Sequence, residues 1–298
     1  MVRVRAPAKL NLHLEILARE ESGYHQLETV FCELDLADQV EIEPATAGIE
    51  LLLDGASPET AAALGAARDN LAFRAAQLYL AETGVLTGVR IRLRKRIPLG
   101  GGLGGGSSDA AATLVALDRM HRERLGEEGR LRLGAQLGSD VPFFLCGSPL
   151  ALAWGRGGRL LPLEPLPSLP VLLLIPGQGI ATTDAYTSLD RARHGHPDRA
   201  APRVLRTSRL SDWDYLARHA RNDFEAVVFE RLPQLADAKA MLLQEGALLA
   251  LLTGSGSTIY GVFRDQARLQ RAADTAAATG LRAVATRTAC PPSPPPFG

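Results

Sequence analysis

The sequence predicts an α+β protein of two domains. Its 298 residues are enough for two domains of typical size, and 46% of them are hydrophobic, so each domain can bury a substantial core. Segments that alternate like strands are interspersed with segments that have the apolar spacing of helices. The glycine-rich stretch Trp154–Gly158 and the proline-rich residues 161–170 after it indicate the boundary, which predicts domains at 1–158 and 159–298.

The individual elements follow from the spacing of apolar residues and from start and stop signals. Period-two alternation and short buried runs predict strands at residues 2–6, 9–17, 28–35, 39–43, 49–53, 89–97, 149–154, 171–175, 248–252 and 258–263. Helical spacing with start signals predicts helices at residues 69–82, 107–120, 128–137, 211–219, 222–230, 233–244 and 265–279. The C-terminal run Cys290–Gly298 is rich in proline, and we expect it to be frayed.

Composition excludes several classes of function. Lys+Arg 33 balance Asp+Glu 33, so no global field favours nucleic acid or an anionic membrane as a partner. Cys32, Cys146 and Cys290 are an odd number without CxxC spacing, which favours reduced thiols over a disulfide framework or a zinc site. The N-terminus lacks the apolar region of a signal peptide, and runs such as Val171–Ile175 are too short to span a bilayer. We therefore expect a cytoplasmic protein without a membrane partner.

The segment Pro98–Asp109 reads Pro-Leu-Gly-Gly-Gly-Leu-Gly-Gly-Gly-Ser-Ser-Asp and is the most informative part of the chain. Glycine loses more conformational entropy on folding than any other residue, so six glycines in one loop require a reason. An alternating strand, Val89–Ile97, precedes the loop, and a helix beginning at Ser107 with an N-cap residue follows it. Unpaired N–H groups and the macrodipole at such a helix start attract an anion, so we interpret the loop as a phosphate-binding site.

Three other interpretations of this loop carry less weight. A flexible linker is disfavoured because ordered elements adjoin the loop on both sides. A Walker A loop is excluded because Gly106 is followed by Ser107 and not by lysine. Gly100, Gly102 and Gly105 satisfy G-x-G-x-x-G, but this string is weak in so glycine-rich a segment and lies far from an N-terminal βαβ unit. A dinucleotide site stays open as the less favoured alternative.

Five motifs together resemble a known family. The loop Pro98–Ser108, the opening Ala6–Leu12 (Ala-Pro-Ala-Lys-Leu-Asn-Leu) and the late Thr253–Ser257 (Thr-Gly-Ser-Gly-Ser) resemble the three signature motifs of the GHMP kinases, which include galactose, homoserine, mevalonate and phosphomevalonate kinases. Gly23–Thr29 (Gly-Tyr-His-Gln-Leu-Glu-Thr) and Gly138–Phe143 (Gly-Ser-Asp-Val-Pro-Phe) narrow the resemblance to the branch in the non-mevalonate isoprenoid pathway. The strings occur in the expected order over nearly the whole chain, so the combination is specific.

The resemblance implies both a fold and a reaction. The fold has a ribosomal protein S5 domain 2-like N-terminal domain and a ferredoxin-like C-terminal domain. The reaction is ATP-dependent phosphorylation of the 2-hydroxyl of a small-molecule substrate, a cytidine diphosphate-linked methylerythritol. ATP and Mg²⁺ are the implied cofactors, but we name no metal ligand, because a glutamate that some family members use has no counterpart that we can locate. We expect a monomer or weak homodimer.

The resemblance assigns Lys9 and Asp140 as the catalytic pair. Phosphoryl transfer needs positioning, charge neutralisation and a group that takes the proton of the attacking hydroxyl. Asp140 follows Gly138 and precedes Pro142, so its carboxylate can be presented from a turn or a helix start and act as general base. A cation beside it, Lys9, would keep that carboxylate ionised. Taken singly, Asp140 could be a helix N-cap and Lys9 a surface lysine, but the motif context favours catalysis.

The remaining site residues are also assigned by the resemblance. Nucleotide contacts fall on Lys95, Pro98, Gly100, Gly101, Gly102, Leu103, Gly104, Gly105, Gly106, Ser107 and Ser108. Substrate contacts fall on Asn11, Tyr24, His25, Phe31, Thr182 and Tyr186. Tyr24 would stack on the cytosine base, and the hydrogen bonds of His25 would select it. Core packing for Phe31 and Tyr186, and helix capping for the two serines, are the plainer alternatives.

Other functions remain open at this stage. Another GHMP kinase, of mevalonate or homoserine type, would have no use for the Tyr24–His25 pair, since its substrate lacks a nucleobase. A non-catalytic nucleotide-binding regulator would bind ATP without consuming it. An RNA-binding module is disfavoured by the zero net charge. The basic segment 191–209 is interpreted as a charged surface loop in preference to a lid, and His194 and His196 lack further ligands for a metal.

Overall fold

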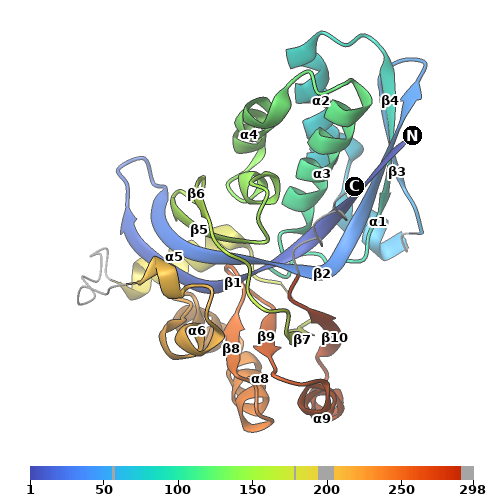
Figure 1. Ribbon diagram of the computed structural model, residues 1–298. Coiled ribbons are helices and arrows are strands. Elements are labelled where there is room, and N and C mark those ends of the chain that lie inside the picture. The colour runs from blue at the N-terminus through green and yellow to red at the C-terminus, as the bar shows by residue number, and fades with distance from the viewer. Residues whose placement is uncertain (56–57, 178, 194–204, 290–298) are drawn as a thin grey trace, which may run out of the picture.

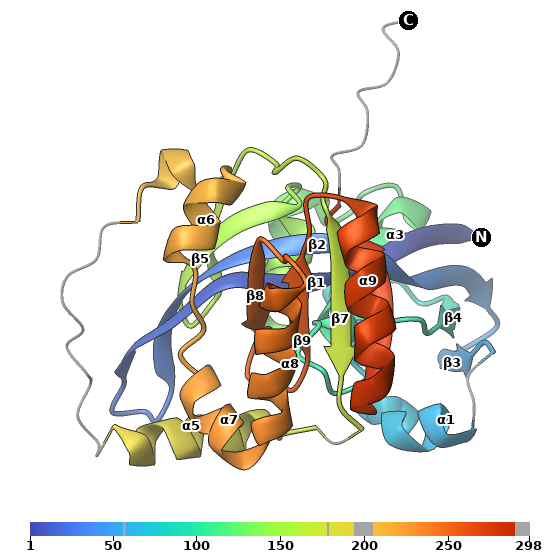
Figure 2. The ribbon, with the colours of Figure 1, turned by 90° about the horizontal axis from the view of Figure 1, so that it is seen from below.

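Two β-sheets pack face to face, and helices cover the outer face of each, giving four layers in the order helix, sheet, sheet, helix (Figures 1 and 2). The computed structural model describes residues 1–55, 58–177, 179–193 and 205–289. The expected frayed tail and residues 194–204 of the basic segment lie outside this range. Among the described helices, none has the length and apolar character that crossing a membrane requires.

The first sheet is built around one long strand, β2. It pairs with β1 along one edge and with β4 and β5 on the other, while β3 extends the sheet beyond β4 and β6 extends it beyond β5. Helices α2, α3 and α4 pack on its outer face. The bounds are β1 (Val2–Arg19), β2 (His25–Ala45), β3 (Ile49–Leu53), α1 (Pro58–Leu64), α2 (Leu71–Thr83), β4 (Gly88–Arg94), α3 (Gly105–Met120), α4 (Gly126–Leu137), β5 (Leu150–Gly155) and β6 (Arg159–Pro162).

The second sheet has the strand order β10-β7-β9-β8, with every neighbouring pair antiparallel. Helices separate β7 from β8 and β9 from β10, which is the β-α-β-β-α-β arrangement of a ferredoxin-like unit and confirms that prediction. Helices α8 and α9 lie across its outer face (Figure 2). The bounds are β7 (Pro170–Ile175), α5 (Thr182–Ala192), α6 (Trp213–His219), α7 (Glu225–Arg231), α8 (Pro233–Gln244), β8 (Leu249–Leu252), β9 (Ile259–Val262), α9 (Gln266–Ala276) and β10 (Arg282–Arg287).

The two sheets share one hydrophobic core. Leu10 and Leu12 of β1 are buried in the same cluster as Leu173 of β7 and Leu251 of β8. β1 alternates, so the residues between these leucines point the other way. Leu10 and Leu12 of β1 therefore pack against the second sheet, while the alternate residues of the strand face the loops at the edge of the sheet.

Two pairs of predicted strands are single strands in the structure. The predicted segments 2–6 and 9–17 belong to β1, and 28–35 and 39–43 belong to β2. β1 crosses Pro7 without ending because the register shifts between Pro7 and Lys9 while both sides stay paired to β2. The predicted helix 107–120 begins earlier, at Gly105, and its N-cap is the left-handed Gly104 and not a serine, so a serine cap was wrong.

Among the α-helices and strands of the described residues, four were not predicted: α1, α5, β6 and β10. β6 pairs with β5 and extends the first sheet to Pro162, beyond the boundary expected at residue 158. β10 and β6 are short edge strands, and α5 is rich in threonine, which is a weak helix former. Of the cysteines, Cys32 is buried and free and Cys146 is partly buried and free, whereas Cys290 lies outside the described residues.

Glu33 gives the fold a predictable pH dependence. Its backbone ties β2 to Pro149 and to Ala289, and burial raises the pKa of its carboxyl to about 7, although Arg5 acts in the opposite direction. The ordinary value is 4.5, so folding favours the protonated form. The stability that Glu33 contributes is therefore present at low pH and is lost as pH rises through about 7.

We expect Glu33→Gln to raise the free energy of unfolding at pH 8 by on the order of 2 kcal/mol, because the amide needs no proton. The gain should shrink as pH falls toward the ordinary pKa of 4.5. Urea unfolding of both proteins across this pH range measures it. A gain of constant size at every pH would contradict the assignment.

Candidate active site

Lys9 and Asp140 face each other across the space between β1 and the start of a short 3₁₀ helix, η2 (Val141–Leu145). The Lys9 Nζ lies 3.4 Å from the Asp140 Oδ2. Lys9 is 3% exposed, whereas the Asp140 side chain is 33% exposed and can be reached from a cavity. Asp140 occupies the N-cap position of η2 but makes no side-chain capping bond. Its carboxylate is therefore directed to the lysine and not to the helix end.

Irregularities in β1 aim Lys9 and its neighbour Asn11 at this point. The pairing register shifts between Pro7 and Lys9 and again between Asn11 and His13, and such bulges commonly re-aim side chains beside functional sites. The Lys9 backbone N–H donates to the Leu103 carbonyl at 2.9 Å, which fastens β1 to the glycine loop. The Lys9 ammonium donates to Asn11 Oδ1 at 2.6 Å.

Asn11 joins the two halves of the molecule. Its Oδ1 accepts from Lys9 and also from the backbone N–H of Gly254 at 2.9 Å, in the loop between β8 and β9. Its Nδ2 donates to Thr29 Oγ1 at 2.7 Å, and Thr29 Oγ1 donates in turn to the His13 carbonyl at 2.6 Å. Because every polar atom of the amide is engaged, its orientation is fixed. Thr29 ends the Gly23–Thr29 motif, but it was assigned no role from the sequence.

The glycine loop is packed against the 253–257 loop and against Lys9. Gly102 has φ +76°, and a Cβ there would lie 2.4 Å from the Thr253 carbonyl oxygen. Gly104 has φ +72°, and a Cβ there would lie 2.9 Å from Lys9 Cγ. The loop 253–257 connects the antiparallel strands β8 and β9, so it is both a hairpin turn and a wall of the site.

A first cavity, of about 300 Å³, opens over the glycine loop and the start of α3. The α3 N-cap is Gly104, which has no side chain to satisfy the first N–H groups of the helix. Ser108 is 1% exposed, and its Oγ has no hydrogen-bond partner among the described residues. Free N–H groups at the start of a sixteen-residue helix fit a phosphate anion. Of the residues predicted to contact nucleotide, all except Ser108 line this cavity.

Lys95 lines the same cavity, but its ammonium is already paired. It donates to Asp109 at 2.6 Å and to Asp38, and all three side chains are buried. Burial alone would lower the pKa of Lys95, but the carboxylates of Asp109 and Asp38 outweigh it and raise that pKa. Burial also raises the pKa of Asp109 to about 7, although Lys95 beside it acts in the opposite direction. The lysine therefore fastens the end of β4 to α3, and little of its charge is left for an anion.

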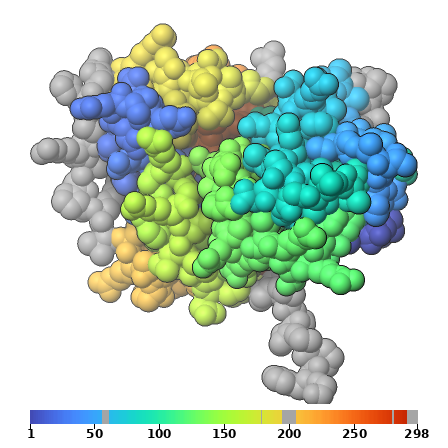
Figure 3. Space-filling view, turned by 90° about the horizontal axis from the view of Figure 1, so that it is seen from above, coloured from blue at the N-terminus to red at the C-terminus, as the bar shows by residue number. Residues whose placement is uncertain are grey.

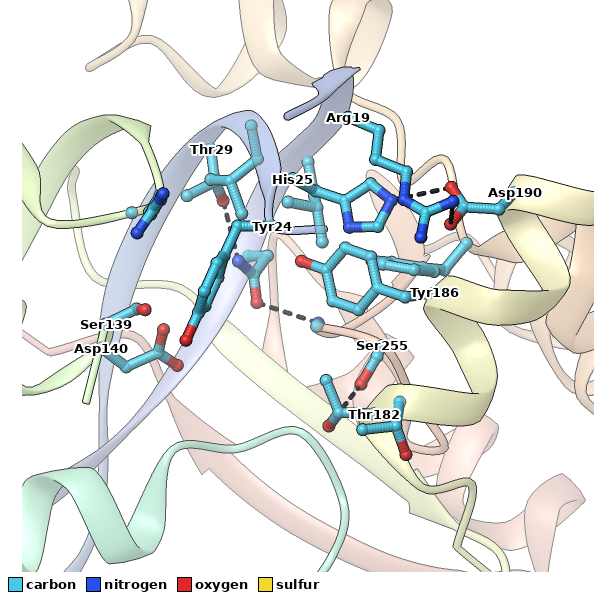
Figure 4. Close-up of a pocket in the computed structure, with 18 of the residues that line it drawn as sticks. Arg19, Tyr24, His25, Thr29, Ser139, Asp140, Thr182, Tyr186, Asp190 and Ser255 are labelled. Carbon is cyan, nitrogen blue, oxygen red and sulfur yellow. Dashed lines mark hydrogen bonds and ion pairs between the residues drawn. The ribbon is translucent and has the colours of Figure 1, made fainter. Parts of the chain in front are cut away.

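A second cavity, of about 530 Å³, is open to the surface, where the molecule is hollowed between the tip of the β1–β2 hairpin, α5 and the segment around η2 (Figures 3 and 4). Lys9 lines this cavity, and its side chain lies beside Gly104, which lines the first cavity. The second cavity is lined by all the predicted catalytic and substrate residues: Lys9, Asn11, Tyr24, His25, Phe31, Asp140, Thr182 and Tyr186. In Figure 4, Tyr24 and Asp140 lie on one side of the cavity, and His25 and Tyr186 lie on the other. The space between them separates two aromatic walls.

The aromatic residues of this cavity are firmly held. The His25 ring stacks on Tyr186 with centroids 4.5 Å apart, and Tyr186 meets Phe224 edge-on at 4.8 Å. Tyr24 is 60% exposed, and the Arg156 guanidinium lies 4.2 Å from the centroid of its ring. Aromatic faces this close to open space can stack on a planar ligand.

Phe31 and Thr182 differ in how far they reach into the cavity. Phe31 is 3% exposed and packs on Phe143 at 4.9 Å, so core packing accounts for most of its surface. It also lies beneath Lys9 Nζ, which is 5.2 Å from its centroid. Thr182, at the start of α5, accepts a hydrogen bond from Ser255 Oγ at 3.1 Å.

Three charged residues at the aromatic end were missed by sequence reasoning. Arg156 lies in the glycine-rich stretch that was interpreted only as a domain boundary, and it pairs with Glu20. Asp190 on α5 lies 2.7 Å from His25 Nε2, and Arg19 lies 3.5 Å from the other oxygen of Asp190. No local motif marks these residues, because each acts on a partner far away in the sequence.

Comparison with known proteins identifies the family. The model of the GHMP kinases N terminal domain matches residues 70–148, and that of the GHMP kinases C terminal domain matches residues 204–280. The 4-diphosphocytidyl-2-C-methyl-D-erythritol kinase of Pelotomaculum thermopropionicum is 39% identical over 290 residues, covering 97% of this chain and 98% of that protein. The kinase of the same name from Solibacter usitatus is 40% identical over 277 residues, covering 90% and 83%.

Solved structures agree with this relationship. A crystal structure of 4-(cytidine 5'-diphospho)-2C-methyl-D-erythritol kinase has a TM-score of 0.79 at 37% identity and covers 97% of this chain and 99% of its own. A homoserine kinase from Cytophaga hutchinsonii, at 18% identity, has a TM-score of 0.69, covers 97% of this chain and 94% of its own, and shares the fold. This chain therefore belongs to the GHMP kinases, a family of ATP-dependent small-molecule kinases, together with the 4-diphosphocytidyl-2-C-methyl-D-erythritol kinases of those two bacteria.

Proposed function

We propose that this chain phosphorylates the 2-hydroxyl of 4-diphosphocytidyl-2-C-methyl-D-erythritol with ATP, giving the 2-phosphate and ADP in isoprenoid precursor biosynthesis. The observation that carries the proposal is the position of the Lys9–Asp140 pair: the Lys9 side chain lies beside Gly104, which lines the cavity over the glycine loop, and Lys9 and Asp140 both line the cavity with aromatic walls. A phosphate donor in the first and an alcohol in the second would meet at these two side chains. The relatives described above carry the name of this activity.

Asp140 and Lys9 have complementary roles in this proposal. Bound ATP supplies the phosphoryl group that the hydroxyl accepts. Asp140, part exposed in the cavity, is placed to take the hydroxyl proton as general base. Lys9 supplies a positive charge next to the reacting oxygens, which stabilises the charge that develops during transfer. Its second partner, Asn11, is a neutral amide, so the charge of Lys9 is less fully compensated than that of Lys95.

The nucleotide side of the proposal rests on the glycine loop. Residues 100–107 and the first N–H groups of α3 would hold phosphate oxygens, and Ser108 Oγ would be free to join them or a cation. Mg²⁺ needs few protein ligands when phosphates supply the others. The described residues contain no group of three or more His, Cys, Asp or Glu side chains that could hold a metal by itself. We therefore propose that Mg²⁺ binds together with the nucleotide.

The substrate side of the proposal rests on the aromatic end of the larger cavity. We propose that Tyr24, His25 and Tyr186 enclose the cytosine, while Asn11, Phe31 and Thr182 lie along the remaining part of the substrate. Mevalonate and homoserine contain no aromatic ring, so these rings favour a nucleobase-containing substrate over both. We further propose a cytoplasmic monomer or weak homodimer of two domains, the first of which extends past residue 158 to the end of β6 at Pro162, without nucleic-acid or membrane partners, in keeping with its zero net charge.

The test of this function is release of ADP from Mg-ATP with three alcohols: 4-diphosphocytidyl-2-C-methyl-D-erythritol, mevalonate and homoserine. We expect turnover with the cytidyl substrate alone. Asp140→Asn should lower kcat by about 100-fold or more, because the amide occupies the same space but takes no proton. Turnover with mevalonate or homoserine would contradict the substrate, and an unaffected Asp140→Asn variant would contradict the general base.

Gly104→Ala tests whether the glycine loop positions Lys9. The added methyl group would lie 2.9 Å from Lys9 Cγ, so the side chain that pairs with Asp140 must shift. We expect kcat to fall by about 10-fold or more, since small misplacements of catalytic groups are costly. Gly147→Ala is the matched control, because its φ of +77° is similar but nothing lies within 4 Å of the new methyl. Equal losses of activity in the two variants would assign the effect to backbone strain alone.

A further inference from the structure

The His25 ring is fixed in two ways at the aromatic end of the larger cavity. Its face stacks on Tyr186, and its Nε2 lies 2.7 Å from Asp190 Oδ1 (Figure 4). The His25 side chain is only 9% exposed, so this contact is shielded from competing water. The stacking fixes the plane of the ring, and a flip of the ring within that plane would lose the hydrogen bond to Asp190.

The contact with Asp190 sets which nitrogen of His25 carries the proton. An ionised carboxylate only accepts hydrogen bonds, so Nε2 must be the N–H donor. In the neutral ring, Nδ1 then keeps its lone pair and acts as an acceptor. No partner for Nδ1 is found among the described residues, and His25 lines the cavity. His25 Nδ1 is therefore a hydrogen-bond acceptor that is available to a ligand.

Asp190 is itself held in place, at a position that helix stability does not explain. Its second oxygen, Oδ2, lies 3.5 Å from Arg19, the residue that pairs with His25 across the β1–β2 hairpin. Asp190 lies in the last turn of α5, where the helix dipole disfavours a negative charge. Its contacts thus bridge α5 to the hairpin tip that carries Tyr24 and His25. This bridge compensates for the unfavourable position.

We propose that Asp190 is a positioning residue that determines base specificity: by holding His25 as the Nε2–H tautomer, it makes Nδ1 the acceptor for the exocyclic amino group of cytosine. This inference rests on the proposed function. Cytosine presents an N–H donor at C4, whereas uracil presents a carbonyl oxygen there. Against a fixed acceptor, cytosine gains a hydrogen bond and uracil places two acceptors opposite each other. The structure thus supplies a reason for selecting a cytidyl over a uridyl substrate.

The test compares turnover of the 4-diphosphocytidyl substrate and its 4-diphosphouridyl analogue. Asp190→Ala and Asp190→Asn both release the constraint, since an amide can donate to Nε2 as readily as accept from it. We expect the cytidyl-to-uridyl ratio of kcat/KM to fall by about 10-fold or more in both variants, the range of one base-reading contact. The change should lie in KM for the cytidyl substrate, with kcat and the KM for ATP nearly unchanged.

Asp184→Asn is the matched control, because it removes the same charge from an exposed position in the first turn of the same helix. This control should keep the wild-type ratio. If the Asp190 variants lost activity equally toward both substrates, Asp190 would only brace the hairpin, and the inference would be overturned. If the wild type turned over neither substrate, the proposed function would fall first and this inference with it.

A measurement on the unmodified protein addresses the tautomer directly. Long-range ¹H–¹⁵N correlation spectra distinguish the two neutral forms of histidine, and a His25→Gln variant assigns the signal. We expect His25 in the wild type to be the Nε2–H form and to lose that preference in Asp190→Asn. A wild-type spectrum of the Nδ1–H form would overturn the inference whatever the kinetics showed.

Discussion

The site depends on one buried hydrogen-bonding group, the side-chain amide of Asn11. Its oxygen accepts from Lys9 on its own strand and from Gly254 in the loop between β8 and β9 of the second sheet, while its nitrogen donates to Thr29 of β2. An amide buried to 3% exposure cannot leave these partners without a penalty of a few kcal/mol, since water does not replace them. The docking of the two sheets and the position of the Lys9 ammonium are therefore a single constraint, and the active site is complete only when both sheets are packed.

Two buried lysines near the glycine loop show how partners decide what a cation can do. Lys95 sits between the carboxylates of Asp38 and Asp109, which compensate its charge and convert it into a link between β4 and α3. Lys9 has one neutral amide and one partly exposed carboxylate, so its charge still acts on whatever enters the cavity. From the sequence alone, Lys9 was assigned to catalysis and Lys95 to nucleotide binding, and nothing marked one of them as structural. The number of carboxylates within reach, which depends on the tertiary fold, separates a structural ion pair from a reactive one.

Sequence patterns were sufficient where the determining interactions are local. Helix α8 was predicted at its observed bounds, 233–244, because apolar spacing and a proline at its start mark it unambiguously. Each of the five motifs contributes residues to the lining of the two cavities, with Ser108 buried beside them. What failed mostly depends on distant partners: β10 becomes a strand only by pairing with β7, far away in the sequence. Likewise, Arg156 and Glu20 are 136 residues apart, and Asp190 and His25 are 165 residues apart, so no spacing rule links them.

Phosphate binding explains only part of the high glycine content of the glycine loop. Its glycines were attributed to the close approach of a phosphate, yet Gly102 and Gly104 are required by protein neighbours, Thr253 and Lys9. Gly106, by contrast, has only the end of Leu71 near the position of a Cβ, at 3.6 Å. One end of the loop is therefore glycine-rich because two loops and a lysine interlock there. The other end is glycine-rich where the cavity opens over the helix start, and there the ligand remains the better explanation.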